Sequence, residues 1–288
     1  MLSNCSYLTL AAINFLLFLR IPIILNQNGV YYPAWYSGDW SNQNTRMKHA
    51  YHKASYVFWQ SEFCRRAADH FLGHRSGPGE ILYNAVDTRH FSPFKNRQIR
   101  PFTFLITGKI ESHQYYRIES TFCALSLARS QGFDLRLIVA GYLENPQKGH
   151  ALATQHGVIN SVTFIGPYTQ QEAPFIYNMA DAYVTMTYMD NCPNTVLEAM
   201  SCGLPVLYSA SGGVPELVGP DCGIGISVPE SWTDVHVPPS AAIAQAMIAL
   251  MKYSASYSLA ARTRALEYFD IHKWINRHSA IFNSLLSL

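Results

Sequence analysis

The sequence predicts an α/β protein whose C-terminal part is a doubly wound parallel sheet. From Phe102 onward, short β-rich apolar runs alternate with helical segments, and 49% of the chain is apolar. Strands buried on both faces read as continuous apolar runs, and alternating helices cover both faces of one parallel sheet. The expected strands are 102–107, 135–140, 162–165, 182–187, 205–208 and 225–228. The expected helices between them are 118–129, 146–156, 170–179, 194–202 and 214–218.

The chain is expected to divide into three parts. Residues 1–93 show a helix, a strand, an aromatic loop, another helix and short strands, and they form a partial N-terminal α/β domain with about three strands. Residues 94–270 form the doubly wound domain, and residues 271–288 form a helix that packs back toward the N-terminal domain. The basic, aperiodic stretch 94–101 is the best linker candidate. The expected helices of the last part of the chain are 240–253, 256–269 and 272–287.

Composition excludes several classes of protein. The chain has 21 Lys and Arg against 19 Asp and Glu, and a net charge of +2 provides no broad footprint for nucleic acid, so no such partner is expected. The six cysteines include no C-x-x-C pair and are typical of thiols in a reducing compartment, which favours the cytoplasm. Because there is no Asp-x-Asp pair, no divalent metal site is predicted.

The N-terminal segment is apolar and raises the question of a membrane. Residues 1–19 carry no charge, and the mostly apolar run Tyr7–Leu19 is shorter than the roughly 20 residues of a spanning helix. We expect a buried core helix there. A segment seated in a membrane, which would give the protein peripheral membrane contact, and a secretory signal remain alternatives, although no Lys or Arg precedes the apolar run.

Two acids flank the start of one predicted helix. In parallel sheets ligands bind beyond the carboxyl ends of the strands, and Asp190 lies in such a loop after a strand that ends near Tyr188. Asn194 is expected to cap the next helix, which places Glu198 in its second turn on the same side as Asp190. The backbone N–H groups at the helix start would then face an anion, and the carboxylates would bind a vicinal diol. The alternative is a capped surface helix with two solvated acids.

This stretch resembles the donor-site signature of family 4 (group 1) glycosyltransferases, which have the two-domain GT-B fold. The motif has two acids separated by seven residues, followed here by 199–206 and by the Gly212-Gly213 turn with its following helix. The segment 84–93 also resembles the interdomain linker of that family, and the resemblance extends over roughly residues 23 to 270. It implies a GT-B fold of α/β class with a Rossmann-like C-terminal domain and an incomplete N-terminal one. The chain would then be shortened at its N-terminus.

The resemblance also implies an activity. Such a protein moves a hexose-like sugar from a nucleotide diphosphate sugar to a glycan or lipid-linked acceptor, with retention at the anomeric carbon. Because the chain has no Asp-x-Asp pair, no metal ion or other cofactor is expected to take part. Asp190 would contact the transferred sugar and Glu198 the ribose of the nucleotide. The family usually has Glu at the first position, so the Asp190 side chain is one methylene shorter.

Positive charge is needed where the diphosphate leaves. After the strand 102–107, Gly108 lets the backbone approach a ligand and Lys109 takes the first basic position of the family pattern. The second basic position near Gln114 is not basic here, and we expect Arg117 to replace it. The alternative is that Arg117 is a solvated residue at a helix start that pairs loosely with Glu111.

Other residues are expected to complete the donor site. The Gly212-Gly213 turn would form a second backbone nest in the same crevice, and Glu216 matches a family position, although favourable contact with its own helix start explains it equally well. The base of the nucleotide is expected near Tyr168. The remaining candidate substrate-binding residues are Asn191, Asn194 and Thr195.

The aromatic loop of the first domain could contact the acceptor. Its aromatic residues could form a wall for a sugar ring, or they could simply stabilise a long loop: they are Tyr31, Tyr32, Trp35, Tyr36 and Trp40. Two rival hypotheses remain. One is a truncated, catalytically inactive remnant that binds a nucleotide sugar. The other is a dinucleotide-dependent epimerase or oxidoreductase, which lacks the expected G-x-G-x-x-G after an early strand.

Overall fold

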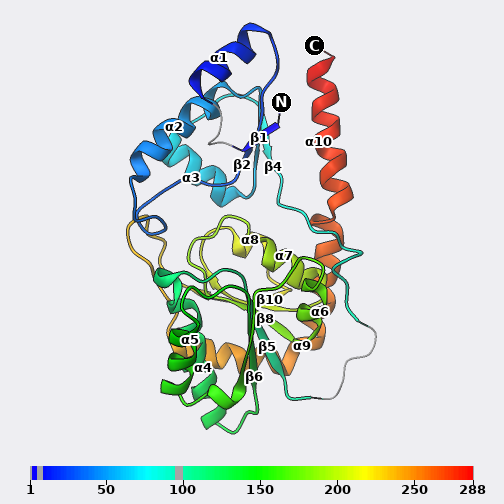
Figure 1. Cartoon of the computed structure of the whole chain (residues 1–288). Coiled ribbons are helices and arrows are strands. Elements are labelled where there is room, and N and C mark those ends of the chain that lie inside the picture. The colour runs from blue at the N-terminus through cyan, green and yellow to red at the C-terminus, as the bar shows by residue number, and fades with distance from the viewer. Residues whose placement is uncertain (1, 5–8, 95–99, 288) are drawn as a thin grey trace.

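The chain folds into two lobes, each built on a parallel sheet. The computed structural model describes residues 2–4, 9–94 and 100–287. The N-terminal sheet has the order β1-β2-β3-β4 and the C-terminal sheet the order β10-β9-β8-β5-β6-β7. Figure 1 shows the smaller N-terminal lobe above the larger one, with both chain ends at the same end of the molecule. The α/β class expected from the sequence is confirmed, with one parallel sheet in each lobe. Within the expected linker, residues 95–99 lie outside the described part.

The N-terminal lobe has one more strand than expected. Its elements are β1 (Leu2–Asn4), α1 (Leu10–Phe18), β2 (Ile24–Gln27), α2 (Trp40–Lys53), β3 (Tyr56–Trp59), α3 (Glu62–Leu72) and β4 (Gly79–Ile81). The helix α3 begins where the Ser61 side chain accepts a hydrogen bond from the N–H of Cys64, and it ends at Gly73, whose φ is 88°. The helix α2 was not among the expected elements, because its sequence is largely polar and gives only a weak apolar stripe.

The C-terminal lobe follows the expected alternation closely. Its strands are β5 (Thr103–Thr107), β6 (Arg136–Ala140), β7 (Val162–Gly166), β8 (Ala182–Thr185), β9 (Val206–Ala210) and β10 (Gly223–Ser227). Its helices include α4 (Tyr116–Ser130), α5 (Pro146–Gln155), α6 (Ala173–Asn178), α7 (Asn194–Ser201) and α8 (Val214–Val218). The strand order reverses between β5 and β8, which pair in parallel. Such a switch point leaves a crevice beyond the strand ends where ligands bind.

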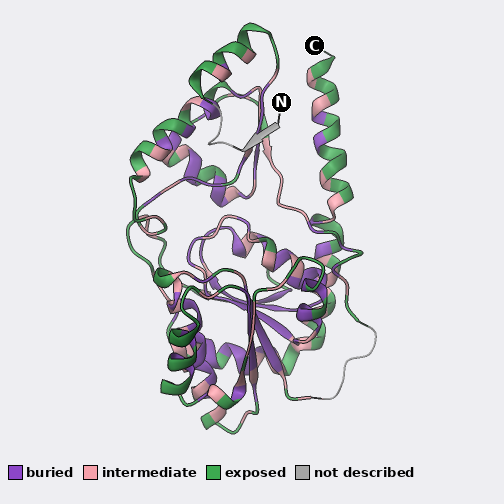
Figure 2. Ribbon diagram, viewed as in Figure 1, coloured by how far each residue is buried: buried purple, intermediate pink, exposed green. Residues whose placement is uncertain are grey.

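Both faces of this sheet are covered by helices, which explains the apolar strands. Leu105 and Tyr183 point into a core with α6, α7 and α8, whereas Phe104 and Val184 point into a second core with α4 and the long helix α9 (Ser240–Tyr268). Figure 2 shows the buried strands between these layers. The expected helices 240–253 and 256–269 correspond to the two arms of this element, which meet at a kink where Tyr253 has non-helical backbone angles.

The last helix, α10 (Ile271–Leu286), leaves the larger lobe and runs beside the N-terminal sheet (Figure 1). His278 Nε2 lies 3.1 Å from Asn26 Oδ1, and the rings of His278 and Phe58 are 4.3 Å apart. Arg277 forms an ion pair with Glu80 on β4, with an N–O distance of 2.6 Å. The final helix therefore connects the two lobes.

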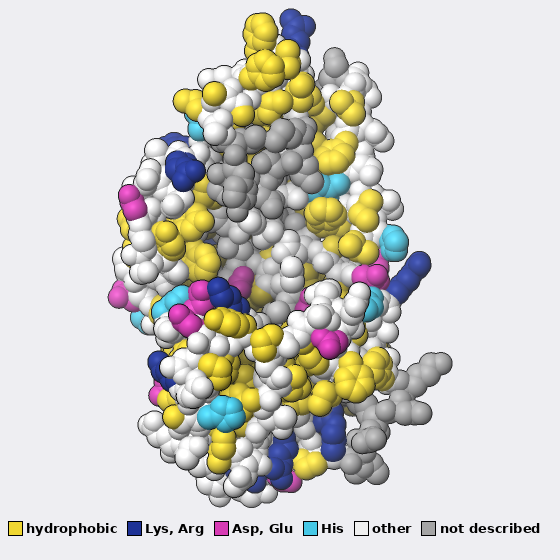
Figure 3. All heavy atoms as spheres, viewed as in Figure 1, with side chains coloured by type: hydrophobic (Ala, Val, Ile, Leu, Met, Phe, Trp, Pro, Cys, Tyr) yellow, Lys and Arg dark blue, Asp and Glu magenta, His cyan; other side chains and the backbone are white. Residues whose placement is uncertain are grey.

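The expectation that the apolar segment near the N-terminus forms a buried core helix is wrong: the helix α1 forms there, but most of it is exposed. Only Ile13 of α1 is buried, and the side chains of Phe15 and Phe18 are 61% and 83% exposed. Hydrophobic side chains accordingly gather at that end of the molecule in Figure 3. Apolar composition on all sides of a helix indicated burial, but the fold supplies a packing partner for one side only. Within the described residues, none of the helices has the length and apolarity to span a bilayer.

Candidate functional site

A cavity of about 430 Å³ lies between the lobes at the switch point of the larger sheet. Its floor is formed by the segments that follow β5 and β8 and by the first turns of α4 and α7. The N-terminal lobe contributes the other wall, through the loop that follows β2. This volume lies in the range of roughly 300 to 1,000 Å³ that is typical of small-molecule sites. From the C-terminal lobe, the lining includes Thr107, Gly108, Lys109, His113, Gln114, Arg117, Asp190, Asn191, Asn194 and Thr195.

The turn after β5 brings Gly108 and Lys109 to the cavity. Gly108 has φ of 114°, and its carbonyl packs so closely on Gly141 that a Cβ at position 141 would overlap it. The Lys109 side chain is 64% exposed and its Nζ lies 2.6 Å from Glu111 Oε1. This contact raises the pKa of Lys109, so the ammonium stays charged. Lys109, rather than Arg117, is therefore the cation that pairs with Glu111.

Arg117 is buried and is not the solvated residue of the alternative hypothesis. It is 8% exposed on α4, and its Nη1 donates to the Lys109 carbonyl at 3.3 Å. Its Nε is buried and has no hydrogen-bond partner among the described residues. A buried guanidinium with an unused donor, at the wall of a cavity, is arranged to receive an anion.

The loop after β8 carries Asp190 next to Arg117. Removal of water from around the half-buried Asp190 carboxyl raises its pKa, and the Arg117 guanidinium opposes that rise. Met189 before it has φ of 51°, and its carbonyl accepts a hydrogen bond of 2.9 Å from the Tyr32 hydroxyl of the other lobe. The Oδ1 atom of Asn191 is buried and has no hydrogen-bond partner among the described residues. The cavity thus holds an acid, a cation and an unused amide acceptor side by side.

The start of α7 differs in detail from the expectation. The cap position is Pro193, and Asn194 is the first helical residue, so Asn194 does not cap the helix. Its Oδ1 instead accepts a hydrogen bond of 2.9 Å from Asn84, which also donates to the Cys192 carbonyl. Asn194 and Thr195 both line the cavity, and the positive end of this helix faces it.

Glu198 lies one turn deeper and does not line the cavity itself. Its carboxylate accepts hydrogen bonds from Tyr177 at 2.7 Å and from Gln170 at 3.1 Å. The Tyr177 hydroxyl also lies 3.1 Å from Thr107 Oγ1, and Thr107 does line the cavity. Glu198 is therefore connected to the cavity through two hydrogen bonds. Loss of hydration raises its pKa, while Tyr177 and Gln170 oppose the rise.

Tyr168 belongs to the same network. Burial raises its pKa to about 12, and hydrogen bonding to Thr107 and Tyr177 opposes this effect. Like Glu198, it lies behind the cavity wall. The sequence reasoning missed Tyr177, Gln170 and Thr107, and no motif marked them. Tyr177 and Gln170 reach Glu198, and Thr107 reaches Tyr177, only through contacts between segments that are distant along the chain.

The Gly212-Gly213 turn does not line the cavity either. The Gly213 N–H donates to the Asp190 carbonyl at 2.8 Å, and a Cβ on Gly213 would overlap the Asn191 carbonyl oxygen. Gly212 has φ of 67° and is in similarly close contact with Met189. These glycines therefore let the turn pack against the loop that carries Asp190, and they position that loop.

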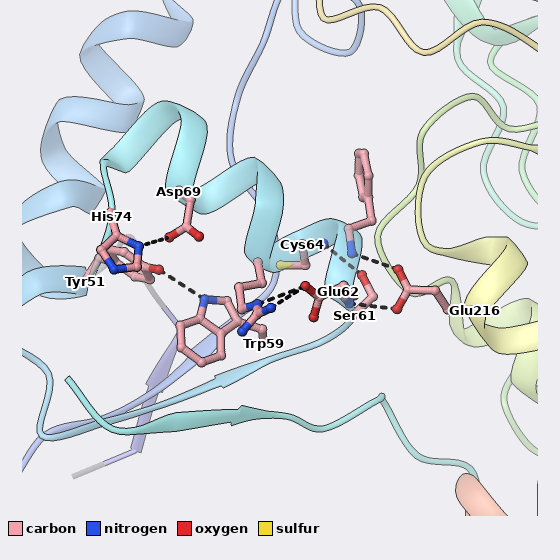
Figure 4. Close-up of polar contacts among 10 residues, drawn as sticks. Tyr51, Trp59, Ser61, Glu62, Cys64, Asp69, His74 and Glu216 are labelled. Atoms are coloured by element: carbon pink, nitrogen blue, oxygen red, sulfur yellow. Dashed lines mark hydrogen bonds and ion pairs between the residues drawn. The ribbon is translucent and has the colours of Figure 1, made fainter. Parts of the chain in front are cut away.

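Glu216 connects the two lobes. Its carboxylate oxygens accept the backbone N–H groups of Glu62 and Phe63, each at 2.7 Å, at the N-terminus of α3 (Figure 4). A carboxylate at a helix N-terminus satisfies free donors and opposes the positive end of the helix dipole. Glu216 was expected either to interact favourably with the N-terminus of its own helix or to contact a ligand. Its carboxylate instead caps the N-terminus of α3 in the other lobe.

The aromatic loop divides into buried and exposed members. Tyr32 is 2% exposed and packs against Phe71 and Trp232. Trp35 is 50% exposed and lines the cavity. Trp40 packs edge-on against Phe71 and is not a lining residue. Packing within the lobe therefore accounts for Tyr32 and Trp40, whereas Trp35 is placed where a ligand could reach it. His113 and Gln114, which also line the cavity, were not singled out as binding residues.

Metal ligands do not cluster in the part of the chain that the structure describes. Within it, no group of three or more His, Cys, Asp and Glu side chains is placed to hold a metal ion. Among the described residues that line the cavity, the Asp, Glu, Lys and Arg side chains are those of Asp190, Lys109 and Arg117.

Two parallel-sheet lobes with a cleft at the switch point of the second sheet define a GT-B protein. The family model described as "Glycosyl transferases group 1" matches residues 91–260, which is more than half of the chain. The chain belongs to this family of glycosyltransferases.

Individual relatives cover less of the chain. A D-inositol 3-phosphate glycosyltransferase of Mycobacteroides abscessus is 33% identical over 96 residues, which are 32% of this chain and 21% of that protein. Similar enzymes of Mycobacterium strains also match at 33% over 90 residues. The matching region thus spans about a fifth of the length of these relatives.

Solved structures resemble the whole chain. Anabaena HepE, crystallised in complex with UDP and glucose, aligns with a TM-score of 0.74 at 18% identity, over 100% of this chain and 78% of that one. Sucrose-phosphate synthase of Thermosynechococcus elongatus aligns with the same score at 17% identity, over 99% of this chain and 73% of that one. At such identities the likeness concerns the fold.

Proposed function

We propose that the protein is a hexosyltransferase that moves a sugar from a nucleotide diphosphate sugar to a glycan or lipid-linked acceptor, with retention at the anomeric carbon. One observation carries the proposal. The described residues contain five buried side-chain polar atoms without a hydrogen-bond partner, and two of them, Arg117 Nε and Asn191 Oδ1, belong to residues that line the same cavity. One is a cationic donor that suits a phosphate and the other an acceptor that suits a hydroxyl.

The cations would act on the leaving group. Transfer breaks the bond between the anomeric carbon and the phosphate oxygen and forms a bond from that carbon to the oxygen of an acceptor hydroxyl. The proton of that hydroxyl passes to the departing phosphate oxygen, and a nucleoside diphosphate is left. Arg117 and Lys109 would stabilise the negative charge that develops on the diphosphate, aided by the N–H groups of Asn194 and Thr195 and the close approach that Gly108 allows. Such a preorganised donor is worth about 3–4 kcal/mol of transition-state stabilisation. No resident metal ion or other cofactor is part of this proposal.

The acids would bind hydroxyl groups. Asp190 lies beside Arg117 and would contact the transferred sugar, with Asn191 as a neighbouring acceptor. Glu198 would hold the ribose, for which its hydrogen bonds to Tyr177 and Gln170 provide a fixed orientation. The ribose must reach it past Thr107, so part of that network would rearrange when the nucleotide binds. Tyr168 would lie near the base, and Gly212, Gly213 and Glu216 would position the site without touching the donor.

We further propose that the protein works in the cytoplasm at a membrane surface. Cys123, Cys192 and Cys222 are free thiols, which suits a reducing compartment. The exposed Phe15 and Phe18 of α1 would provide the apolar contact with the lipid.

Calorimetric titration with UDP and GDP tests the central assignment. We expect one of the two nucleotides to bind the wild type, and Arg117→Gln to weaken it by at least about tenfold, the effect of losing one charged contact. Arg129→Gln, on the same helix but in an exposed pair with Asp134, is the matched control and should bind like the wild type. Equal binding by Arg117→Gln would overturn the assignment. Nucleotide binding without consumption of any nucleotide sugar would favour the inactive remnant.

A further inference from the structure

The wall of the cavity that belongs to the N-terminal lobe differs in character from the opposite wall. Its lining residues are Asn28, Tyr32, Ala34 and Trp35, and none of these described residues is charged. The cations of the cavity, Lys109 and Arg117, lie on the other wall. A ligand seated against the first wall would therefore find apolar and amide surface.

Trp35 is the most prominent group on this wall. Half of its surface is exposed, although tryptophan is among the residues that gain most from burial. One side of the indole is supported by Tyr31, whose ring is stacked on it at 6.5 Å with an interplanar angle of 27°. Tyr36 in turn packs edge-on against Tyr31 at 4.9 Å. The indole is thus backed by a small aromatic stack.

The residues just before Trp35 are held in place by hydrogen bonds. Before it, the backbone of Tyr31 exchanges two hydrogen bonds with the Asn44 side chain, at 2.9 and 2.6 Å. The Tyr32 hydroxyl donates to the Met189 carbonyl, and the Ala34 N–H donates to the Trp232 carbonyl at 2.9 Å. Because two of these bonds reach the C-terminal lobe, the loop that carries the indole has a fixed position relative to the segment with Asp190. A preorganised aromatic surface binds with little loss of conformational entropy.

We infer that Trp35 is the platform for the acceptor, and that the acceptor end seated there is an uncharged sugar ring. One face of a pyranose carries axial C–H groups and is apolar, whereas its rim carries hydroxyls. Such a ring fits an indole in a cavity that also has polar lining residues such as His113 and Gln114. A phosphorylated polyol would place a dianion against a wall that has no cation. This inference rests on the proposed function and gives the substrate class of its acceptor side. It distinguishes the chain from relatives whose name includes inositol 3-phosphate.

The test uses the full chain loaded with UDP. Four probes are titrated against it, one at a time: methyl α- and β-glucopyranoside, methyl α-galactopyranoside and myo-inositol 3-phosphate. Binding is followed by saturation-transfer NMR. We expect at least one methyl pyranoside to bind more tightly than inositol 3-phosphate, and Trp35→Ala to weaken it by at least about tenfold, as for truncation of a central aromatic contact. Trp35→Phe should recover most of this loss, because it restores an aromatic face. UDP affinity should be unchanged in both variants.

Trp40→Ala is the matched control. Trp40→Ala removes a tryptophan of the same lobe that does not line the cavity, and it should leave pyranoside binding unchanged. The inference is overturned if no pyranoside binds the wild type, if Trp35→Ala binds it equally well, or if inositol 3-phosphate is preferred. If UDP fails to bind, the proposed function fails, and the same pyranoside titrations on the protein without UDP still decide the role of Trp35.

Discussion

The carboxylate of Glu216 accepts the backbone N–H of Phe63 at 2.7 Å, although the two residues belong to different lobes. The same carboxylate accepts the N–H of Glu62, so one acid of α8 satisfies two donors at the start of α3. Ser61, the cap of that helix, lies close enough to Gly213 that its Oγ would contact a Cβ there. The turn that positions Asp190 and the helix of the opposite lobe are therefore in direct contact.

Glu216→Ala should lower the free energy of unfolding by about 1–2 kcal/mol, because it removes a carboxylate cap and leaves two N–H groups without their partner. UDP affinity should change by less than about twofold. Urea unfolding and calorimetry measure the two quantities. Glu230→Ala is the control: its carboxylate is 40% exposed and pairs with Arg66 across the same interface at 3.4 Å, so the loss should be under about 0.5 kcal/mol. Weaker UDP binding at unchanged stability would instead place Glu216 in the donor site.

Gly213→Ala tests whether this glycine serves close packing. The added Cβ would overlap the Asn191 carbonyl, so the loop that leads from Asp190 to the start of α7 must move. We expect a loss of stability of about 1–3 kcal/mol together with weaker UDP binding, because the N–H groups of Asn194 and Thr195 would move away from the diphosphate. Gly132→Ala is the comparison. Its φ of 91° makes alanine strained, but nothing lies within 4 Å of the new Cβ, so it should lose stability without any effect on UDP. Intact UDP binding in Gly213→Ala would contradict the positioning role.

Glu198→Gln should alter the pH dependence of stability. Because burial raises the pKa of Glu198 above its ordinary 4.5, the folded state holds this proton more tightly than the unfolded state. The resulting stabilisation is fully present below the unfolded pKa and is lost as the pH rises through the folded pKa. The wild type should therefore lose stability more steeply than Glu198→Gln as the pH is raised from 4.5, in urea unfolding at successive pH values.

Glu172→Gln provides a control of opposite sign for that experiment. Hydrogen bonds from Thr169 lower the pKa of Glu172 below its ordinary 4.5. The stability that Glu172 contributes is therefore present above pH 4.5 and is lost as the pH falls through the folded-state pKa. If Glu198→Gln left the pH profile of the wild type unchanged, its carboxyl would be in contact with water in solution.

Asp190→Asn should separate binding from transfer. The amide keeps the size of the side chain but removes the charge beside Arg117, and we expect the transfer rate to fall by about a hundredfold. UDP contains no transferred sugar, so its affinity should change by less than about threefold. Steady-state transfer assays and calorimetry give the two values, with Asp221→Asn, on an exposed turn, as the control. A large loss of UDP affinity would move Asp190 from the sugar to the nucleotide.

Much of the larger lobe could be predicted because its signals are local. The strands 102–107 and 135–140 were found within a residue of β5 and β6, and Gly203 and Pro205 marked the end of α7. The local sequence pattern gave the wrong prediction where burial of a helix depends on which segment packs against it. The apolar α1 has a packing partner for Ile13 alone, and the polar α2 is formed in spite of its weak stripe.

The sequence by itself determined the alternation of strands and helices, the two acids at the start of α7 and the family, because each depends on residues that are neighbours along the chain. Only the tertiary structure decided which of these residues share a cavity. It joined Lys109, Arg117 and Asp190 there, placed Glu198 behind Tyr177, and turned Glu216 toward the other lobe. The physical reason is that contacts between distant segments follow from how sheets and helices pack, which no local periodicity encodes.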